Sequence, residues 1–336
     1  DPAFDQQPWP STRVVGQPLP KVDGYERVSG TAVYPADMVL PGMLYGAMLR
    51  CPHAHAVVTS VDMSEAENMP GVRAVLSAFT DDRATRPHSE TIRNQLFPST
   101  CRFEGEAVAA VAADTPYQAR DALRVMRVEY DVQPFLSDER KALEPDAHQV
   151  HDDGNRSGRA GSYERGNVDA GFAEADVVLE EEYRTEIQMH APMEPHGCVA
   201  NWDGDSLTVW ESTQGVYNIQ PAVAGALGMP LSRVRVINHY MGGGFGSKLQ
   251  AGKYTIASAL LAKIAARPVK ITLSREETFL ATGNRPSANM RIKAGVKRDG
   301  TLTAIEYSGT GTGGAYGNGG ASSLDWLTRD CYVCPN

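Results

Sequence analysis

Short apolar runs separated by turn residues characterise the chain from residue 24 to residue 136. Runs of this length predict β-strands at residues 28–37, 43–51, 73–77, 107–114 and 126–131. Thr115 and Pro116 suit the N-cap and the first position of a helix. The helix that they predict has one apolar face, formed by Ala119, Ala122, Leu123 and Met126. Strands combined with a helix predict a compact α+β unit over residues 24–136.

The pattern changes over residues 137–165, where Asp, Arg and Gly are frequent, and this composition predicts a linker or a long surface loop. Apolar periodicity resumes from residue 166 and predicts strands at 177–184, 197–203, 207–213, 233–240, 269–274, 290–297 and 302–309. An alanine-rich run predicts a helix at 252–266 that stops before Pro268. With a Pro-rich arm over residues 1–23, the chain is expected to contain an arm, a first domain, a linker and a second domain over 166–336.

Composition restricts the possible partners and the compartment. The 336 residues carry a net charge of −9 and no basic block, which argues against nucleic-acid binding. The sequence has no run of about 18 apolar residues, so it predicts no membrane span. Its first residues do not have the pattern of a secretion signal. The odd number of cysteines, five, fits a reducing compartment, so we expect a cytoplasmic location. Cys331 and Cys334 form a lone CxxC without a second ligand pair and are read as ordinary thiols.

A glycine-rich segment, residues 240–248 (YMGGGFGSK), joins a predicted strand to the alanine-rich helix. Glycines let a ligand approach the backbone, and free amides ahead of a helix attract an anion. The P-loop pattern is not met, because Ser247 precedes Lys248 and Leu249 follows it. Taken alone, the segment is compatible with a tight turn or with an anion-binding loop.

Further motifs accompany this loop in a fixed order. They are MEPHG (193–197), WESTQ (210–214), MGGGFGSK (241–248) and GGAYGNGG (313–320), preceded by VGQP (15–18), VDG (22–24) and FEGEAVAAV (103–111). Together they resemble the molybdenum hydroxylases, the family of xanthine dehydrogenases and aldehyde oxidoreductases. The resemblance covers nearly the whole chain from about residue 14. It implies an α+β fold: an a/b hammerhead domain over 24–136, followed by the N-terminal part of a molybdopterin-binding domain over 166–336.

The resemblance also implies roles for particular residues. Gln214 would hydrogen-bond an oxygen ligand of the molybdenum, a task for which an amide offers both a donor and an acceptor. The backbone at Gly243, Gly244, Phe245 and Gly246 would lie against the molybdopterin, expected in its cytosine dinucleotide form. No side chain is expected to ligate the metal. The implied reaction is hydroxylation of an aldehyde or an N-heteroaromatic compound with oxygen from water.

Other polar residues near these motifs are expected to act indirectly. Glu194 is interpreted as structural, because the general base of the family lies elsewhere. His190 and His196 are interpreted as hydrogen-bonded polar residues near the site, and Arg285 and Tyr316 as neighbours of the pocket. Members close to xanthine dehydrogenase place a glutamate where this chain has Leu249. An apolar residue there weakens the case for a purine substrate.

The resemblance finally implies several partner chains. The later arginine-containing cofactor loop and the C-terminal glutamate base of the family would follow residue 336. Either a second chain carrying the C-terminal half supplies them, as we expect, or the chain was cleaved or truncated. An iron–sulfur (2Fe-2S) subunit and an FAD subunit are expected to receive the electrons. The alternative is a non-catalytic molybdopterin carrier or assembly protein. Retention of Gln214 beside Phe245 favours the enzyme, because a carrier has no evident need for a group directed at the metal.

Overall fold

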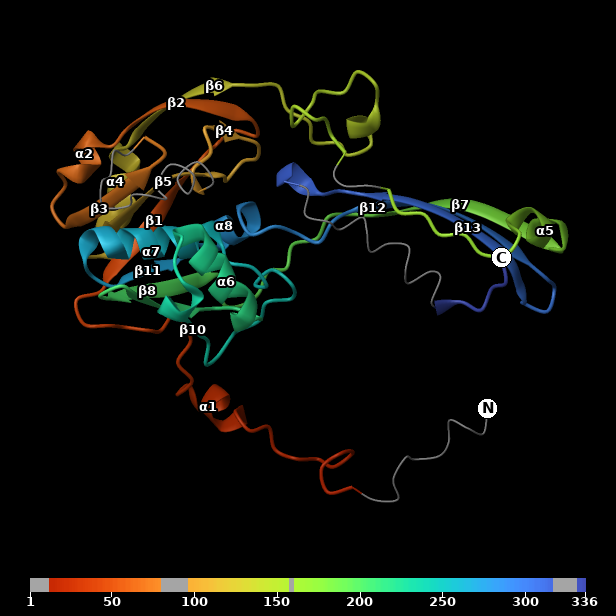
Figure 1. Cartoon of the computed structure of the whole chain (residues 1–336), viewed down its shortest axis with the longest axis horizontal. Helices are drawn as coiled ribbons and strands as arrows, with labels where there is room; N and C mark the ends of the chain where they lie inside the picture. Colours follow the sequence, from red (N-terminus) through yellow and green to blue (C-terminus); the bar gives the residue numbers. More distant parts are fainter. Residues whose placement is uncertain (1–11, 80–95, 157–159, 317–330) are drawn as a thin grey trace.

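The computed structural model describes residues 12–79, 96–156, 160–316 and 331–336. These residues form a layered body of helices and sheets, from which a long three-stranded sheet extends to one side (Figure 1). The mixture of helices with sheets confirms the α+β class. Within the described ranges, no helix is long and apolar enough to cross a membrane.

The body is built around a seven-stranded sheet. Its strands lie in the order β10 (Val234–Ile237), β9 (Ser206–Glu211), β8 (Gly197–Asp203), β11 (Val269–Thr272), β1 (Leu44–Arg50), β5 (Ala107–Ala113) and β3 (Val72–Ser77). β1 pairs in parallel with β11 and antiparallel with β5. The predicted first and second domains are therefore joined by continuous backbone pairing.

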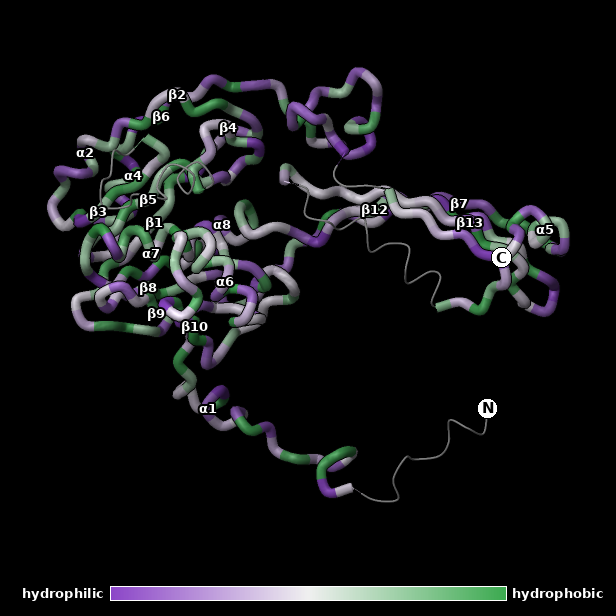
Figure 2. The backbone as a smooth tube through the Cα atoms, in the orientation of Figure 1, coloured by the Kyte–Doolittle hydropathy of each residue, from purple (hydrophilic) through white to green (hydrophobic). Residues whose placement is uncertain are grey.

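Helices cover both faces of this sheet. α7 (Lys253–Ala265) is buried without interruption from residue 254 to residue 262, and it packs with Ala110 and Ala112 of β5. α4 (Pro116–Val125) packs with the alternate β5 residues Ala109 and Val111 on the other face. All seven residues of β5 are buried because both faces of the strand are covered. Figure 2 shows the apolar segments concentrated in this body.

The helix predicted after Thr115 is confirmed. Thr115 Oγ1 accepts a hydrogen bond from the backbone N of Gln118 at 3.2 Å, and Pro116 occupies the first turn. A small sheet, β4–β2–β6, lies on the part of the body that contains α4. It consists of β2 (Ala56–Asp62), β4 (Thr100–Cys101) and β6 (Arg127–Val132), with the short helix α2 (Ser64–Glu67) after β2.

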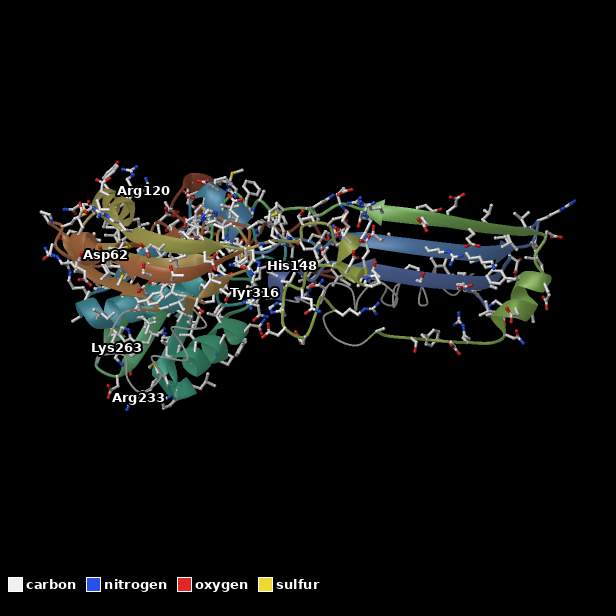
Figure 3. All side chains as sticks on the ribbon, turned by 90° about the horizontal axis from the view of Figure 1, so that it is seen from above. Asp62, Arg120, His148, Arg233, Lys263 and Tyr316 are labelled. Atoms are coloured by element: carbon white, nitrogen blue, oxygen red, sulfur yellow. The ribbon has the colours of Figure 1, made fainter. Side chains whose placement is uncertain are left out.

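The extended sheet has the order β13–β12–β7. Its strands are β7 (Val177–Thr185), β12 (Ala288–Val296) and β13 (Leu302–Gly311), and α5 (Val168–Ala173) packs at its far end. All nine residues of β7 are exposed within this chain. Figure 3 shows the strands of this sheet side by side, with Tyr316 and His148 near the junction between the sheet and the body.

The structure differs from the sequence-based elements at one predicted strand and at two helices. Residues 28–37 form no strand: α1 (Gly24–Ser29) ends at the left-handed Gly30, residues 31–34 are irregular, and a turn covers residues 35–37. Two helices were not predicted, α6 (Val216–Leu227) and α8 (Arg275–Leu280). α6 contains Pro221, which removes a backbone donor and ordinarily counts against a helix interior.

The predicted linker and arm contain little regular structure. Residues 137–165 include the 3₁₀ helix η3 (Lys141–Leu143), and other 3₁₀ turns are η4 (Leu231–Arg233) and η5 (Gly314–Tyr316). Arg102 Nε donates to Val150 O at 3.0 Å and so ties the linker to the body. Of the arm over residues 1–23, residues 1–11 lie outside the described residues, and the rest forms turns.

Candidate functional site

Three of the sequence motifs meet at one edge of the seven-stranded sheet. β9 and β10 are parallel, so Gln214 after β9 and residues 241–248 after β10 emerge at the same edge. β8 is antiparallel to β9, so the segment before β8, with Glu194 and His196, begins at this edge too. We call residues 241–248 the glycine loop, and the loop together with Gln214, Glu194 and His196 the loop site. The fourth motif, GGAYGNGG, lies partly outside the described residues.

Gln214 holds the glycine loop. Its Oε1 accepts hydrogen bonds from the backbone N of Gly246 at 2.7 Å and of Lys248 at 3.3 Å, and its backbone N donates to Lys248 O at 2.9 Å. Within the described part of the chain, the Nε2 of this exposed side chain has no hydrogen-bond partner. The amide oxygen is therefore engaged by the loop, and two N–H donors remain for a ligand.

Glycine is required at two loop positions for different reasons. A Cβ at residue 244 would lie 2.5 Å from Gln214 Oε1, so only glycine permits this approach. Gly246 has φ +99°, a conformation that other residues rarely adopt. The backbone N–H groups of Gly243, Gly244 and Phe245 donate no hydrogen bond to any described residue. Three consecutive unpaired amides form a donor surface for an oxygen-rich ligand.

Phe245 projects from the tip of the loop. It has φ +54°, which is strained for a residue with a Cβ, and 72% of it is exposed. A Cβ at residue 243 would lie 3.0 Å from the Phe245 ring, so the ring lies over Gly243. Phe245 is therefore not a core aromatic within this chain, and its ring is free to contact a ligand.

A buried ion pair supports the loop from below. Lys248 Nζ donates to Glu194 O at 2.8 Å and to Ser212 Oγ at 2.8 Å, and it lies 3.3 Å from Glu194 Oε2. Glu194 Oε2 also accepts from the backbone N of Gly242 at 2.6 Å. The Lys248 side chain is 0% exposed, and burial lowers the pKa of its ammonium group. These contacts agree with the structural role expected for Glu194.

The parts played by Lys248 and Ser212 were not predicted from the sequence. Both residues belong to motifs that were identified, but no periodicity marked them as buried. A lysine inside a glycine-rich loop is ordinarily exposed. Its burial depends on Glu194, which lies 54 residues earlier in the chain.

Two further titratable groups lie beneath the loop. His196 Nε2 hydrogen-bonds to Ser247 O at 3.2 Å, and burial lowers the pKa of this imidazole to about 4, so the ring is neutral. Glu211 is completely buried and accepts from Thr255 Oγ1 at 3.0 Å. Burial raises the pKa of Glu211 to about 8, so the carboxyl group is protonated at neutral pH.

His190 and Arg285 lie beside the loop, whereas Tyr316 makes its contacts elsewhere. A Cβ at residue 246 would lie 3.7 Å from His190 Nε2. Arg285 is paired through its backbone with Gln188, two residues before His190. Tyr316 donates from its hydroxyl to Glu106 Oε1 at 2.6 Å and stacks edge-on against Phe103.

Of the remaining candidates, Leu249 lies next to the loop and the cysteines Cys331 and Cys334 do not. Leu249 is 42% exposed at the end of the loop. Cys331 is exposed, and Cys334 is buried with its Sγ 3.1 Å from Asn336 O. All five cysteines are free thiols. Among the described residues, no cluster of three or more His, Cys, Asp or Glu could hold a metal ion.

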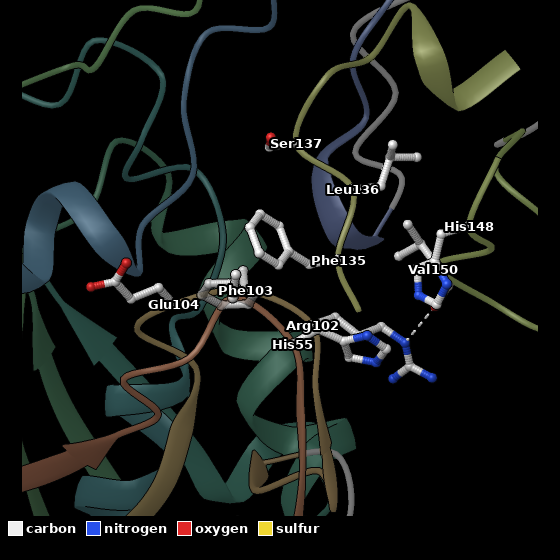
Figure 4. Close-up of a pocket in the computed structure, with 10 residues that line it drawn as sticks. His55, Arg102, Phe103, Glu104, Phe135, Leu136, Ser137, His148 and Val150 are labelled. Carbon is white, nitrogen blue, oxygen red and sulfur yellow. Dashed lines mark hydrogen bonds between the residues drawn. The ribbon is translucent and has the colours of Figure 1, made fainter. Parts of the chain in front are cut away.

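A cavity of about 210 Å³ lies between the linker and the body, and it shares no lining residue with the loop site (Figure 4). Apolar side chains of Phe103, Phe135 and Leu136 line it together with His55 and His148. His55 Nδ1 hydrogen-bonds to Pro134 O at 2.7 Å, so this imidazole is already partnered. The cavity is therefore separate from the loop site.

Comparison with known proteins assigns the chain to a family. Residues 150–336 match the model described as "Molybdopterin cofactor-binding domain". Residues 29–134 match the model described as "Aldehyde oxidase and xanthine dehydrogenase, a/b hammerhead domain". The chain belongs to the molybdopterin-binding subunits of the xanthine dehydrogenase and aldehyde oxidase family. The resemblance found from the motifs is thereby confirmed, as is the succession of hammerhead and molybdopterin-binding folds.

Individual relatives agree with this family. The chain is 36% identical over 330 residues to the nicotinate dehydrogenase large molybdopterin subunit of Eubacterium barkeri, and the match covers 96% of this chain and 77% of that protein. It is 33% identical to the xanthine dehydrogenase molybdenum-binding subunit of Escherichia coli O157:H7, covering 90% of this chain and 42% of the relative. Quinoline 2-oxidoreductase from Pseudomonas putida 86 superposes with a TM-score of 0.78 at 28% identity, covering 87% of this chain and 38% of that one.

The residues of the loop site fit a molybdopterin cofactor of the kind this family binds. The loop offers three unpaired backbone donors at residues 243–245, and Gln214 adds a free amide donor. Close to the loop, His190 Nδ1 is buried without a hydrogen-bond partner among the described residues. A polar ligand would satisfy such groups, which are costly to leave unpaired.

Proposed function

We propose that this chain binds the molybdenum–molybdopterin cofactor at the loop site and serves a multi-chain hydroxylase. The observation that carries the proposal is that the two ends of the Gln214 side-chain amide differ in their partners. Gln214 Oε1 fixes the loop through Gly246, while Nε2 stays free beside the unpaired amides of residues 243–245. Adjacent backbone donors and a side-chain amide donor in one place suit an oxygen-rich ligand.

Each residue of the site has a proposed task. Gln214 Nε2 would donate to an oxygen ligand of the molybdenum, and the backbone N–H groups of Gly243, Gly244 and Phe245 would donate to acceptors of the cofactor. Gly246 keeps the loop in the conformation that presents these groups, and the Phe245 ring would pack against the cofactor. When bound, the cofactor supplies hydroxylation of a carbon centre with oxygen from water and accepts the electrons.

The substrate proposed is an aldehyde or an N-heteroaromatic compound. Relatives are named for nicotinate, xanthine and aldehyde, and a structural neighbour for quinoline. Leu249 stands at the end of the glycine loop and is partly exposed. An apolar side chain offers no hydrogen bond to a purine edge, so a less polar substrate is favoured.

The proposed assembly includes further chains. A second polypeptide would carry the C-terminal half of the molybdopterin subunit. Iron–sulfur (2Fe-2S) and FAD subunits would carry the electrons onward, and the cofactor would be the cytosine dinucleotide form. The assembly is proposed to be cytoplasmic.

The test is purification of the native particle from its source. Every copurifying chain is identified by mass spectrometry, and molybdenum, iron, flavin and the nucleotide of the pterin are quantified. We expect molybdenum and iron together with iron–sulfur and flavin chains, and turnover of an aldehyde or an N-heteroaromatic compound.

Two other results would count against the enzyme. A particle that contains molybdopterin but neither iron nor flavin, and that turns over no substrate, would support the carrier function. A chain that purifies alone and without molybdenum would contradict both functions.

A further inference from the structure

A two-way backbone bridge places Arg285 beside the loop site. Gln188 N donates to Arg285 O at 3.2 Å, and Arg285 N donates to Gln188 O at 2.8 Å. Residues directly opposite in an antiparallel bridge project their side chains to the same side. His190 follows Gln188 by two residues and lies close to Gly246. The bridge therefore places Arg285 beside the segment that carries His190, and His190 lies close to the glycine loop.

Both side chains have unmet bonding capacity. His190 Nδ1 is buried and has no hydrogen-bond partner among the described residues. The Arg285 side chain is exposed, and within those residues its guanidinium makes no ion pair and no hydrogen bond. An unsatisfied buried donor or acceptor destabilises a fold, so a ligand or water is expected to pair with it.

The charges around this point favour an anion. The charge of Lys248 is paired with that of Glu194. The guanidinium of Arg275 has only carbonyl oxygens here, since it donates to Pro192 O at 2.7 Å and to Met193 O at 3.1 Å. Arg285 has no carboxylate partner in the described residues either. Burial, and then the charge of Arg285, lower the pKa of His190, so its ring is neutral and has one N–H to donate.

We propose that Arg285 and His190 form an oxyanion-binding subsite beside the glycine loop. Arg285 supplies a planar fork that matches a carboxylate or a phosphate, and His190 supplies a neutral N–H donor. This inference rests on the proposed function, since the ligand is a group brought to the same site. The oxyanion is either a phosphate of the cofactor's nucleotide tail or a carboxylate on an N-heteroaromatic substrate.

The experiment uses the native multi-chain particle with Arg285→Gln and Arg285→Lys. The backbone bridge does not depend on the side chain, so both variants are expected to fold. Arg233→Gln is the matched control, because Arg233 is an exposed arginine on the body away from the extended sheet (Figure 3). Molybdenum and pterin nucleotide are measured per chain, and KM is measured for pyridine-3-carboxylate and for uncharged quinoline.

Two results support the subsite and identify its ligand. Loss of cofactor from Arg285→Gln, with recovery in Arg285→Lys, assigns a cofactor phosphate. Unchanged cofactor content, with KM for the carboxylate raised at least about tenfold and KM for quinoline unchanged, assigns a substrate carboxylate. A tenfold change is the minimum expected when one charge-assisted hydrogen bond is lost.

The subsite is overturned if Arg285→Gln matches Arg233→Gln in cofactor content and in both KM values. A wild-type particle without molybdenum would refute the proposed function separately. The subsite would then be judged on the same protein by calorimetric titration with inorganic phosphate alone. Weaker binding by Arg285→Gln than by wild type supports it, and equal heats refute it.

Discussion

The side-chain oxygen of Gln214 accepts a hydrogen bond from the backbone N of Gly246 at 2.7 Å, across 32 residues of sequence. This contact fixes which end of the amide faces the loop. The NH₂ end consequently points away from the contact, without a partner in the described residues. A single side chain thus connects the end of β9 with the loop that follows β10.

Gln214→Ala removes both functions of this amide. We expect a modest loss of stability, about 0.5–1.5 kcal/mol for each hydrogen bond, because the side chain is exposed. Turnover by the molybdenum-replete particle should fall at least about tenfold, since one preorganised donor is lost. Urea unfolding and steady-state kinetics measure the two effects. Equal turnover in a molybdenum-replete variant would contradict the role proposed for Gln214.

Gly244→Ala tests the close approach of loop and amide. The added Cβ would lie 2.5 Å from Gln214 Oε1, so either the loop or the amide has to move. We expect the molybdenum content to drop at least about twofold, as measured by mass spectrometry of the metal. Gly225→Ala is the control, because a Cβ in that helix meets nothing within 4 Å. If both variants retain the same molybdenum, the loop does not need this geometry.

Lys248→Met and Glu194→Gln test the buried ion pair. Removing one partner leaves the other as an unpaired charge in a buried position. The free energy of unfolding should therefore fall by about 3–5 kcal/mol for Lys248→Met. The double variant should be less destabilised than the sum of the single variants, because no uncompensated charge remains. Chemical denaturation of the wild type, the two single variants and the double variant gives the double-mutant cycle.

An exposed ion pair serves as the comparison for this cycle. Arg124 and Asp121 are 76% and 52% exposed, and Arg124→Ala should change stability by less than about 1 kcal/mol. Strict additivity of Lys248→Met and Glu194→Gln would show that the two side chains do not act as a pair.

Glu211→Gln should alter how stability depends on pH. Burial raises the folded-state pKa of Glu211 to about 8, above the ordinary value of 4.5. The unfolded chain therefore loses this proton first, and wild-type stability falls as pH rises from 4.5 to 8. Glutamine does not ionise, so the stability of the variant relative to wild type should increase over this range. Urea unfolding at several pH values measures it, and a difference that stays constant with pH would refute the buried, protonated carboxyl.

Much of the local structure was predictable from nearby residues. Thr115 and Pro116 define the start of α4, and alternating apolar positions define strands such as β5 and β8. The strand predicted at 28–37 failed for a local reason too, because Gly30 and Pro35 favour turns that an apolar count does not weigh. The residues of the loop site were predictable only as motifs, and their individual roles remain predictions.

The sequence by itself determined the family, the position of the glycine loop between a strand and a helix, and the segments with strand periodicity. Only the tertiary structure decided that β1 pairs with β11, that Lys248 is buried against Glu194, and that Gln214 gives its oxygen to Gly246. Periodicity reports which face of an element is apolar, but the choice of partner depends on groups far apart in the chain. Those choices emerge only when the whole sheet is assembled.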